Sequence, residues 1–261
     1  MVDYYIGTMG FSYQAWSGAF YPKGLAGRDF LSYYSRIFNA VEIDSTFYGT
    51  PRRESVMRWK VAVPDGFRIC VKVPRSITHD AKLVDVYKEM LAFIDAVKLL
   101  DEKLGVILLQ FPPSFSISNI SQVESFIKDL PEGLRFAVEF RHRSWYAHQT
   151  GEILARHNIC WAATEFSGVP KEVELTSNIL FIRFIGQHGR FRLHDREQIE
   201  VNSQLEWWWG WIQSKIDRLQ SIYCYFNDDF SGHAPAAANK LKSIIGLPIV
   251  NPNLPKQMRL L

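Results

Sequence analysis

Val106-Ile107-Leu108-Leu109-Gln110 is a short apolar run that ends in a polar side chain, and the repetition of this pattern along the chain decides the fold. The same pattern recurs in Val41-Glu42-Ile43-Asp44, Ile69-Cys70-Val71-Lys72 and residues 136–141, 161–164, 180–183 and 223–227. Side chains alternate across a strand, so residues two apart in one run project from the same face. If these strands are parallel neighbours, their polar ends converge on one rim, where parallel α/β enzymes place their chemistry.

Helical patterns fall between these strands. Residues 86–100 carry the apolar stripe of an amphipathic helix, with matches at alternating spacings of four and three. Ser121 and Glu124 have the spacing of a capping box, which predicts the start of a second helix at Ser121. Strands that alternate with helices indicate a parallel sheet.

Eight strands, counting one at Tyr4 to Gly7, predict an α/β fold that closes into a single (β/α)8 TIM-type barrel. The chain lacks a linker or a low-complexity tract, so we expect one domain over residues 1–261. Residues 165–178 show no helical stripe, and the sixth helix is therefore expected to be short or replaced by a loop. An open doubly wound sheet is the alternative, but the G-x-G-x-x-G turn that commonly accompanies it is absent.

Composition and cysteine usage predict a cytoplasmic globular protein. Of 261 residues, 47% are hydrophobic and 22% are charged, and the net charge of +3 is too weakly basic to imply nucleic acid by itself. Cys70, Cys160 and Cys224 lie far apart in apolar runs, which favours buried free thiols. Met1 to Tyr5 has no basic n-region and no apolar run approaches membrane-spanning length, so we expect neither a secretory signal nor a membrane partner.

Glu42 and Glu139 are the candidate general acids or bases, because each follows apolar residues and is expected in the barrel mouth. Burial raises a carboxyl pKa and neighbouring cations lower it, and Lys72, Arg141 and Arg183 are the expected neighbours. These cations favour a small anionic ligand, since arginine binds carboxylate or phosphate bidentately and a strand-end lysine can form a Schiff base with a carbonyl. The alternative is a charge-balanced network that caps the core.

Neutral residues and histidines extend the candidate site. Gln110 and Asn227 end two of the strands and are suited to orienting hydroxyls or carbonyls, although a packed amide is as common. His79 lies in a loop over the mouth, where acid or base chemistry and a loop contact both fit the sequence. Close histidine pairs are absent, so we expect no metal and no cofactor. A magnesium ion held by the two glutamates and Asp228 is disfavoured by the adjacent cations.

Aromatic residues gather in two places. Tyr13 and Trp16 belong to a glycine-hinged loop after the first strand, which either stacks a ring-shaped ligand or packs over the mouth. Trp207-Trp208-Trp209-Gly210-Trp211 cannot turn every indole inward on one helix, because consecutive residues diverge by about 100° around the axis. Helix packing explains most of this second cluster, and a homo-oligomer contact is the alternative.

Motifs along nearly the whole chain carry a resemblance to a known family. They are Gly7-Thr8-Met9-Gly10-Phe11-Ser12-Tyr13 with Trp16 and Phe20-Tyr21-Pro22, Val41 to Tyr48, Lys72-Val73-Pro74 through Thr78-His79, Gln110-Phe111-Pro112-Pro113, Glu139-Phe140-Arg141 with Ser144-Trp145, and Tyr225-Phe226-Asn227. In this order they resemble the YecE-like family, called domain of unknown function 72. The resemblance implies a TIM-type barrel, and its motifs add Tyr48 and Trp145 to the residues expected to bind substrate.

The chain departs from the family pattern at several positions. The family usually has serine, tryptophan and asparagine where this chain has Met9, Phe11 and Asp44. It also has histidine-glycine where this chain has Ile185-Gly186, so a role of that histidine does not carry over. Asp44 adds an acid where the family has an amide.

These residues favour a metal-independent enzyme, a hydrolase or lyase, acting on a small anionic or phosphorylated substrate at the C-terminal mouth. Glu139 or Glu42 then serves as general acid or base, and Lys72 with Arg183 stabilises developing negative charge. A second reading, suggested by likeness to endonuclease-IV-like barrels, is a nucleic-acid-binding protein or phosphodiesterase. A third is a glycoside-cleaving enzyme with paired carboxylates.

Overall fold

The computed structural model describes residues 2–250 and shows an α/β protein built from parallel strands. The strands are β1 (Asp3–Thr8), β2 (Ala40–Ile43), β3 (Arg68–Lys72), β4 (Leu104–Phe111), β5 (Arg135–Phe140), β6 (Cys160–Trp161), β7 (Ala163–Glu165), β8 (Ile179–Phe184) and β9 (Ser221–Phe226). One sheet has the order β2-β3-β4-β5-β6 and the other β1-β9-β8-β7, and every pair is parallel. The apolar runs thus predict most of the strands, but the prediction of eight strands is wrong for the run at residues 161–164, which divides into β6 and β7 in different sheets.

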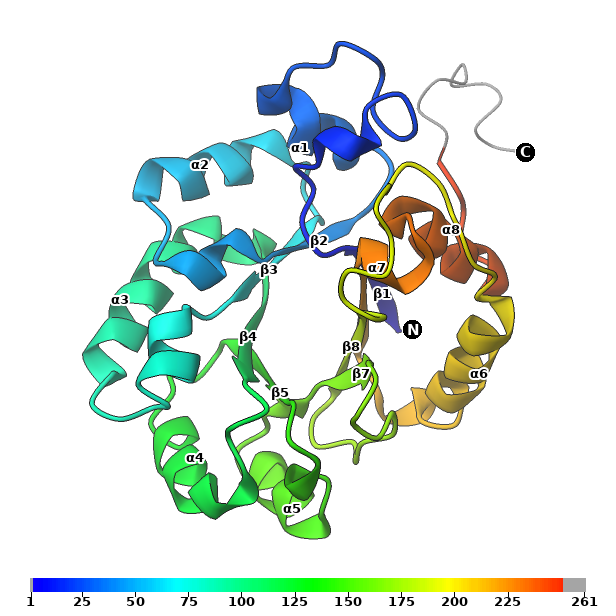
Figure 1. Cartoon of the computed structure of the whole chain (residues 1–261). Coiled ribbons are helices and arrows are strands. Elements are labelled where there is room, and N and C mark those ends of the chain that lie inside the picture. Colours follow the sequence, from blue (N-terminus) through cyan, green and yellow to red (C-terminus); the bar gives the residue numbers. More distant parts are fainter. Residues whose placement is uncertain (1, 251–261) are drawn as a thin grey trace.

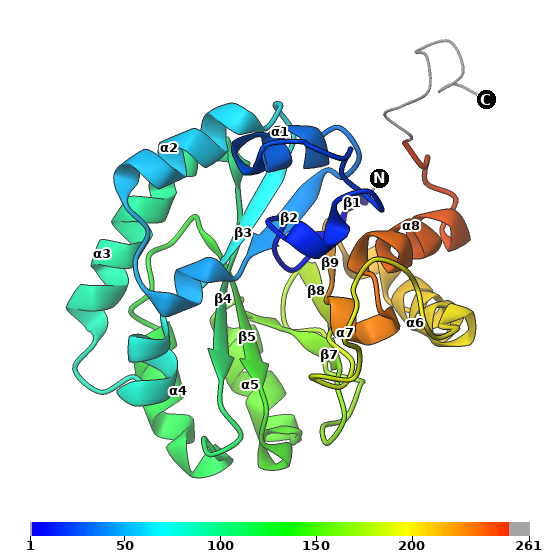
Figure 2. The ribbon, with the colours of Figure 1, turned by 45° about the horizontal axis from the view of Figure 1, so that its top comes forward.

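Helices separate most strands, and in Figures 1 and 2 they lie around the outside of the two sheets. The α-helices are α1 (Phe30–Tyr34), α2 (Arg53–Ala62), α3 (Tyr87–Val97), α4 (Ile120–Ile127), α5 (His148–Arg156), α6 (Asn202–Gln213), α7 (Asp228–Ser231) and α8 (Ala234–Ile244). Shorter helical turns are η1 (Gln14–Trp16), η2 (Gly27–Asp29), η3 (Ser45–Tyr48), η4 (Ser76–Asp80), η5 (Lys98–Lys103), η6 (Ile117–Asn119), η7 (Arg143–Trp145) and η8 (Ile216–Arg218). Within residues 2–250, none of the helices is long and apolar enough to cross a membrane.

The connection between β7 and β8 has no helix in the described chain. Residues 166–178 run irregularly, in agreement with the missing helical stripe in the sequence. Thr176 ties this segment to the sheet, because its hydroxyl donates to the Ile159 carbonyl at 2.6 Å and accepts from the Trp161 N–H at 2.8 Å.

The start of α4 corrects one local prediction. The helix begins at Ile120, and no side chain caps its first turn, so the capping box of Ser121 and Glu124 is wrong. Glu124 instead forms an ion pair with Arg156 at the end of α5. The Glu124 carboxylate therefore pairs with a side chain of another helix and does not cap the start of its own helix.

The tryptophan cluster lies on α6. Trp208 and Trp211 are buried, whereas Trp207 is 42% exposed, so the prediction that the indoles cannot all face inward is confirmed. The Trp208 indole donates to the Glu165 carboxylate at 2.6 Å. Most of the cluster thus packs α6 onto the sheet.

The two sheets meet at the junction of β6 and β7, which are consecutive in the chain and separated only by Ala162. β6 pairs with β5, and β7 pairs with β8. The Ala162 N–H donates to the Val138 carbonyl on β5 at 2.9 Å. One short stretch of backbone therefore belongs to both sheets.

The opposite junction, between β1 and β2, has one backbone bridge, in which the Gly10 N–H donates to the Glu42 carbonyl at 2.7 Å, and is otherwise bridged by side chains. The Tyr34 hydroxyl accepts from the Thr8 N–H at 2.8 Å and donates to the Ala40 carbonyl at 3.0 Å. The Asn39 side chain makes a similar bridge to the Ile6 N–H and the Tyr4 carbonyl of β1. We call this contact between β1 and β2 the side-chain seam.

Each strand has one face toward the helices and one toward an inner core shared by both sheets. The inner core includes Tyr5, Ala40, Cys70, Val106, Leu108, Ala137, Cys160, Ala162, Phe181, Tyr223 and Tyr225. Cys70, Cys160 and Cys224 are free and buried, as predicted. Two residues beyond these inner positions the side chains become polar, for example Gln110 after Leu108, because alternate residues share a face. Polar side chains therefore cover the carboxyl end of the inner core.

Candidate functional site

A cavity lies at the carboxyl ends of the strands, above the inner core. Its volume of about 480 Å³ is in the range of small-molecule sites. It is lined by Met9, Asp44, Phe47, Tyr48, Lys72, Gln110, Pro113, Arg141, Phe166, Arg183, Ile185, His188 and Asn227. We call it the strand-end cavity. Of the predicted site residues, it brings together Tyr48, Lys72, Gln110, Arg141, Arg183 and Asn227.

Arg183, near the end of β8, sits between two buried carboxylates. Its Nε and Nη2 donate to the two oxygens of Glu42 at 2.9 and 2.7 Å, and its Nη1 donates to Glu139 Oε2 at 2.6 Å. The planar guanidinium presents its donors as a fixed fork, which fits this double grip. Glu42 and Glu139 are fully buried, and neither belongs to the cavity wall.

Arg141, one residue beyond β5, completes this network. Its Nε donates to the second oxygen of Glu139. Its Nη1 and Nη2 have no hydrogen-bond partner among residues 2–250, and the Phe166 ring lies 4.1 Å from its Cζ. Two carboxylates therefore meet two guanidinium groups, while one edge of Arg141 is left unpaired beside the cavity.

Burial and the two arginines shift the pKa values of the two glutamates in opposite directions. Burial raises a carboxyl pKa, but Arg141 and Arg183 together outweigh it at Glu139, whose pKa falls to about 2. At Glu42, burial outweighs the attraction of Arg183 and raises the pKa. These contacts match the charge-balanced network rather than a pair of carboxylates facing a substrate.

Lys72, the last residue of β3, differs from both arginines. Its Nζ has no ion-pair or hydrogen-bond partner among residues 2–250 and lies 3.8 Å from the centre of the Phe47 ring. Burial lowers the pKa of this ammonium, the charge of Arg183 lowers it further, and the pKa falls to about 8. Lys72 is thus an unpaired amine in the wall of the strand-end cavity.

His79 lies beside this lysine but outside the cavity wall. Its ring packs edge-on against Phe47 at 4.8 Å, and its Nδ1 is 2.9 Å from the Thr78 hydroxyl. Burial and the charge of Lys72 lower its pKa to about 4, so the ring is neutral at pH 7. These contacts fit a residue that supports Phe47, which is the loop contact of the two alternatives; the role of His79 in acid or base chemistry stays a prediction.

The neutral candidates have structural partners as well as cavity positions. The Gln110 amide donates to the Phe111 carbonyl at 2.6 Å. The Asn227 Oδ1 accepts from the Asp229 N–H at 2.9 Å and caps α7. Tyr48 is 87% exposed at the edge of the cavity.

Three aromatic candidates do not reach the cavity wall, so their predicted contact with substrate is not supported. Trp16 and Trp145 are fully buried, and their indoles donate to the Asp228 carboxylate and to the Phe115 carbonyl. The Tyr13 hydroxyl donates to the Met9 carbonyl at 2.8 Å. These rings pack the loops above the strands, because a large aromatic side chain contributes most when it is buried.

No group of three or more histidine, cysteine or acidic residues with metal-binding geometry occurs within residues 2–250. Asp228, the third ligand of the disfavoured magnesium site, accepts hydrogen bonds from the Trp16 indole and the Ala234 N–H. The donor set of the described cavity therefore does not fit a divalent cation, since cations dominate it.

Several cavity residues escape prediction from sequence. Phe166 follows β7 in the irregular segment, and His188 follows β8, so neither lies in a periodic pattern. Phe47 belongs to the Val41 to Tyr48 motif but offers no polar group that would mark it as a site residue. Position just after a strand is the one signal these residues share.

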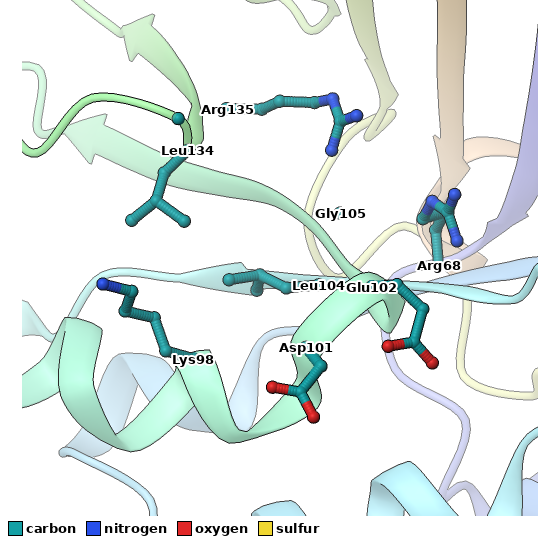
Figure 3. A pocket seen from close by; sticks show the side chains of 9 residues that line it. Arg68, Lys98, Asp101, Glu102, Leu104, Gly105, Leu134 and Arg135 are labelled. Carbon is teal, nitrogen blue, oxygen red and sulfur yellow. The ribbon is translucent and has the colours of Figure 1, made fainter.

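A second pocket, of about 380 Å³, lies at the opposite ends of the strands (Figure 3). Its wall mixes both signs of charge, with Arg68, Lys98 and Arg135 beside Asp101 and Glu102. Parallel α/β proteins, with open or closed sheets, place their chemistry at the carboxyl ends of the strands. The strand-end cavity is therefore the candidate functional site.

Parallel strands whose polar ends surround one cavity define an α/β protein with a ligand-type site at the carboxyl ends of its strands. The chain belongs to the family described as protein of unknown function DUF72, whose profile matches residues 5–259. This finding confirms the resemblance carried by the sequence motifs.

Relatives of the chain include two bacterial proteins of the UPF0759 group. The chain is 28% identical to YecE of Escherichia coli (strain K12) over 202 residues, covering 68% of this chain and 74% of that protein. It is 24% identical to YunF of Bacillus subtilis (strain 168) over 258 residues, covering 87% and 90%.

Solved structures show the same fold. A DUF72 family protein from Thermotoga maritima matches with a TM-score of 0.80 and 29% identity, covering 94% of this chain and 99% of that one. A second, from Enterococcus faecalis, matches with a TM-score of 0.76 and 21% identity over 95% and 99%. The second likeness concerns the fold alone.

Proposed function

We propose that the two sheets close into a single TIM-type barrel domain, in which β6 and β7 form one interrupted strand. The shared backbone at Ala162 supports closure on one side, and the side-chain seam of Tyr34 and Asn39 supports it on the other. In such a barrel the inner core fills the interior and the strand-end cavity is its mouth.

We propose that the strand-end cavity binds a small anionic or phosphorylated substrate and that the protein is an enzyme. One observation carries this proposal: Lys72 and Arg141 line the cavity, and the Lys72 Nζ and the terminal nitrogens of Arg141 lack partners among the described residues. A guanidinium edge suits a planar carboxylate or a phosphate, and an ammonium adds a point charge. Arg183 contributes less, because the glutamates already hold its donors.

The proton-transfer groups are then Lys72 and Asp44 rather than Glu42 and Glu139. With a pKa of about 8, roughly a tenth of Lys72 is neutral at pH 7, against less than about a thousandth for an ordinary lysine. Asp44 is the one carboxylate in the described cavity wall. Both reach substrate from the cavity side, as a general acid or base requires.

Thermal unfolding in the presence of small anions tests the proposal. Inorganic phosphate, glycerol 3-phosphate, pyruvate and citrate are titrated separately, and at least one is expected to raise the melting temperature. A ligand at one hundred times its dissociation constant stabilises by about 2.7 kcal/mol. Lys72→Met and Arg141→Gln should each remove most of this gain, whereas Lys88→Met, at an exposed lysine of α3, should retain it.

The outcome that overturns the anion site is equal stabilisation of wild type, Lys72→Met and Arg141→Gln, or no stabilisation by the whole panel. A single-stranded oligonucleotide that stabilises the chain at low salt while the small anions do not would support nucleic-acid binding instead.

A further inference from the structure

Lys72 has the surroundings of an amine that reacts with carbonyl groups. Lys72 is the last residue of β3, and its Nζ lies over the face of the Phe47 ring. No carboxylate of the described chain lies within ion-pair distance of this nitrogen. The carboxylates nearest to it, Glu42 and Glu139, are held by Arg183. A lysine that only balanced charge would be expected to share those carboxylates.

We propose that Lys72 forms an imine with a carbonyl compound whose carboxylate or phosphate group is bound by Arg141. This inference rests on the proposed anion site and adds the reacting group of the substrate to it. The lowered pKa of Lys72 agrees with the geometry, because only the neutral amine is nucleophilic.

The reaction balances with groups in the cavity. Asp44 first takes a proton from the Lys72 ammonium. The neutral nitrogen attacks the carbonyl carbon, the C–N bond forms as the C=O π bond breaks, and a proton passes from the nitrogen to the oxygen to give a carbinolamine. Asp44 then returns its proton to that hydroxyl, which leaves as water while the nitrogen lone pair forms the C=N bond. The iminium cation then lies against the Phe47 ring, whose face attracts cations.

Arg141 defines the second half of the substrate class. Its two terminal nitrogens are unpaired among the described residues, and Phe166 stacks against the guanidinium so that its edge is held in place. A bidentate partner is a planar carboxylate or a phosphate oxygen pair. The ligand is therefore a small oxo acid or a phosphorylated aldehyde or ketone.

Reductive trapping tests this proposal. The full chain is incubated with pyruvate, 2-oxoglutarate or dihydroxyacetone phosphate in the presence of cyanoborohydride, whose hydride reduces an imine to a stable secondary amine. Peptide mapping by mass spectrometry is expected to find one of these probes on Lys72, at concentrations that leave exposed Lys88 unmodified. The carboxylate and phosphate probes show which anion Arg141 prefers.

Matched variants separate this proposal from anion binding alone. Arg141→Gln should raise the probe concentration needed for half-labelling of Lys72 at least tenfold, and Lys72→Met should abolish labelling at that position. Lactate has the carboxylate of pyruvate but a hydroxyl in place of its keto group, so it should slow the labelling of Lys72 by competition for the anion site.

If these anions stabilise the wild type but leave no label on Lys72, imine formation is refuted and the anion site stands. Labelling of Lys72 no faster than of Lys88 refutes it equally. Absence of both labelling and stabilisation refutes the two proposals together.

Discussion

Arg183 and Lys72 each follow apolar strand residues, and by pattern alone they are equivalent cations. The structure gives them different partners. Arg183 directs three donors at two buried carboxylates, whereas Lys72 Nζ contacts the Phe47 ring and no carboxylate of the described chain. Arg183 therefore holds the two glutamates, and Lys72 is the cation available to the proposed ligand.

This division predicts unequal costs of mutation. Arg183→Met leaves Glu42 and Glu139 buried with less compensation and should lower the free energy of unfolding by about 3–5 kcal/mol. Lys72→Met leaves no carboxylate without its partner and should lower the free energy of unfolding by less than about 1 kcal/mol. Urea unfolding of the two variants beside wild type measures both values, and similar losses would contradict the assignment.

The pKa of Lys72 predicts a dependence of stability on pH. The pKa is about 8 in the folded chain and near its ordinary value of 10.5 in the unfolded chain, so between these values the unfolded state binds more protons. Stability due to Lys72 should therefore rise with pH across this window, by at most about 3 kcal/mol. Below pH 8 both states are charged and this contribution is constant.

Comparison with Lys72→Met isolates the effect from other groups that titrate in the same range. The difference in unfolding free energy between wild type and Lys72→Met, measured in urea at pH 7.5 and pH 10.5, should shift in favour of wild type at the higher pH. A difference that stays the same would mean that Lys72 titrates as an ordinary exposed lysine.

Among the elements, β1 and β2 form the least regular junction of the two sheets. The Tyr34 hydroxyl serves one backbone N–H and one carbonyl across it, and both of these groups are buried. A regular ladder would satisfy them with backbone alone. Apart from one backbone bridge, in which the Gly10 N–H donates to the Glu42 carbonyl at 2.7 Å, the contact of β2 with β1 depends on two side chains from the segment that precedes the strand.

Tyr34→Phe removes a single oxygen atom and should nevertheless lower the free energy of unfolding substantially. It leaves the Thr8 N–H and the Ala40 carbonyl without a partner, which predicts a loss of about 2–4 kcal/mol. Tyr33→Phe is the matched control, because the Tyr33 hydroxyl has no hydrogen-bond partner within residues 2–250. Chemical denaturation of both variants checks the difference, and equal stability of the two would argue against a bridging role.

For the whole molecule, period-two patterns predict most of the strands and the side of the sheets on which the polar ends meet. Lys72, Gln110 and Asn227 are found in one cavity because the strands are parallel and their carboxyl ends coincide. The family motifs add the same architecture independently. Local spacing is sufficient for this part of the site.

Pairing within the site is beyond such patterns. Arg183 donates hydrogen bonds to Glu42, which lies 141 residues earlier in the sequence. Such long-range contacts decide which cation of the site is paired with a carboxylate and which is not. Trp16 and Trp145 show a second limit, since an aromatic residue that packs a loop and one that stacks a ligand look alike in sequence. Phe166 and His188 show a third, because irregular connections carry no period.

Residues 166–178, the connection from β7 to β8 that has no helix, begin with the phenyl ring that covers Arg141. Connections of this kind tolerate insertions and substitutions better than the helices and strands they join. The sequence of this segment can therefore change while Lys72 and the buried charge network keep their positions on the strands. If the proposed function holds, substitutions in this one segment can alter the choice of ligand, in evolution or in protein engineering, without rebuilding the strand ends that carry Lys72.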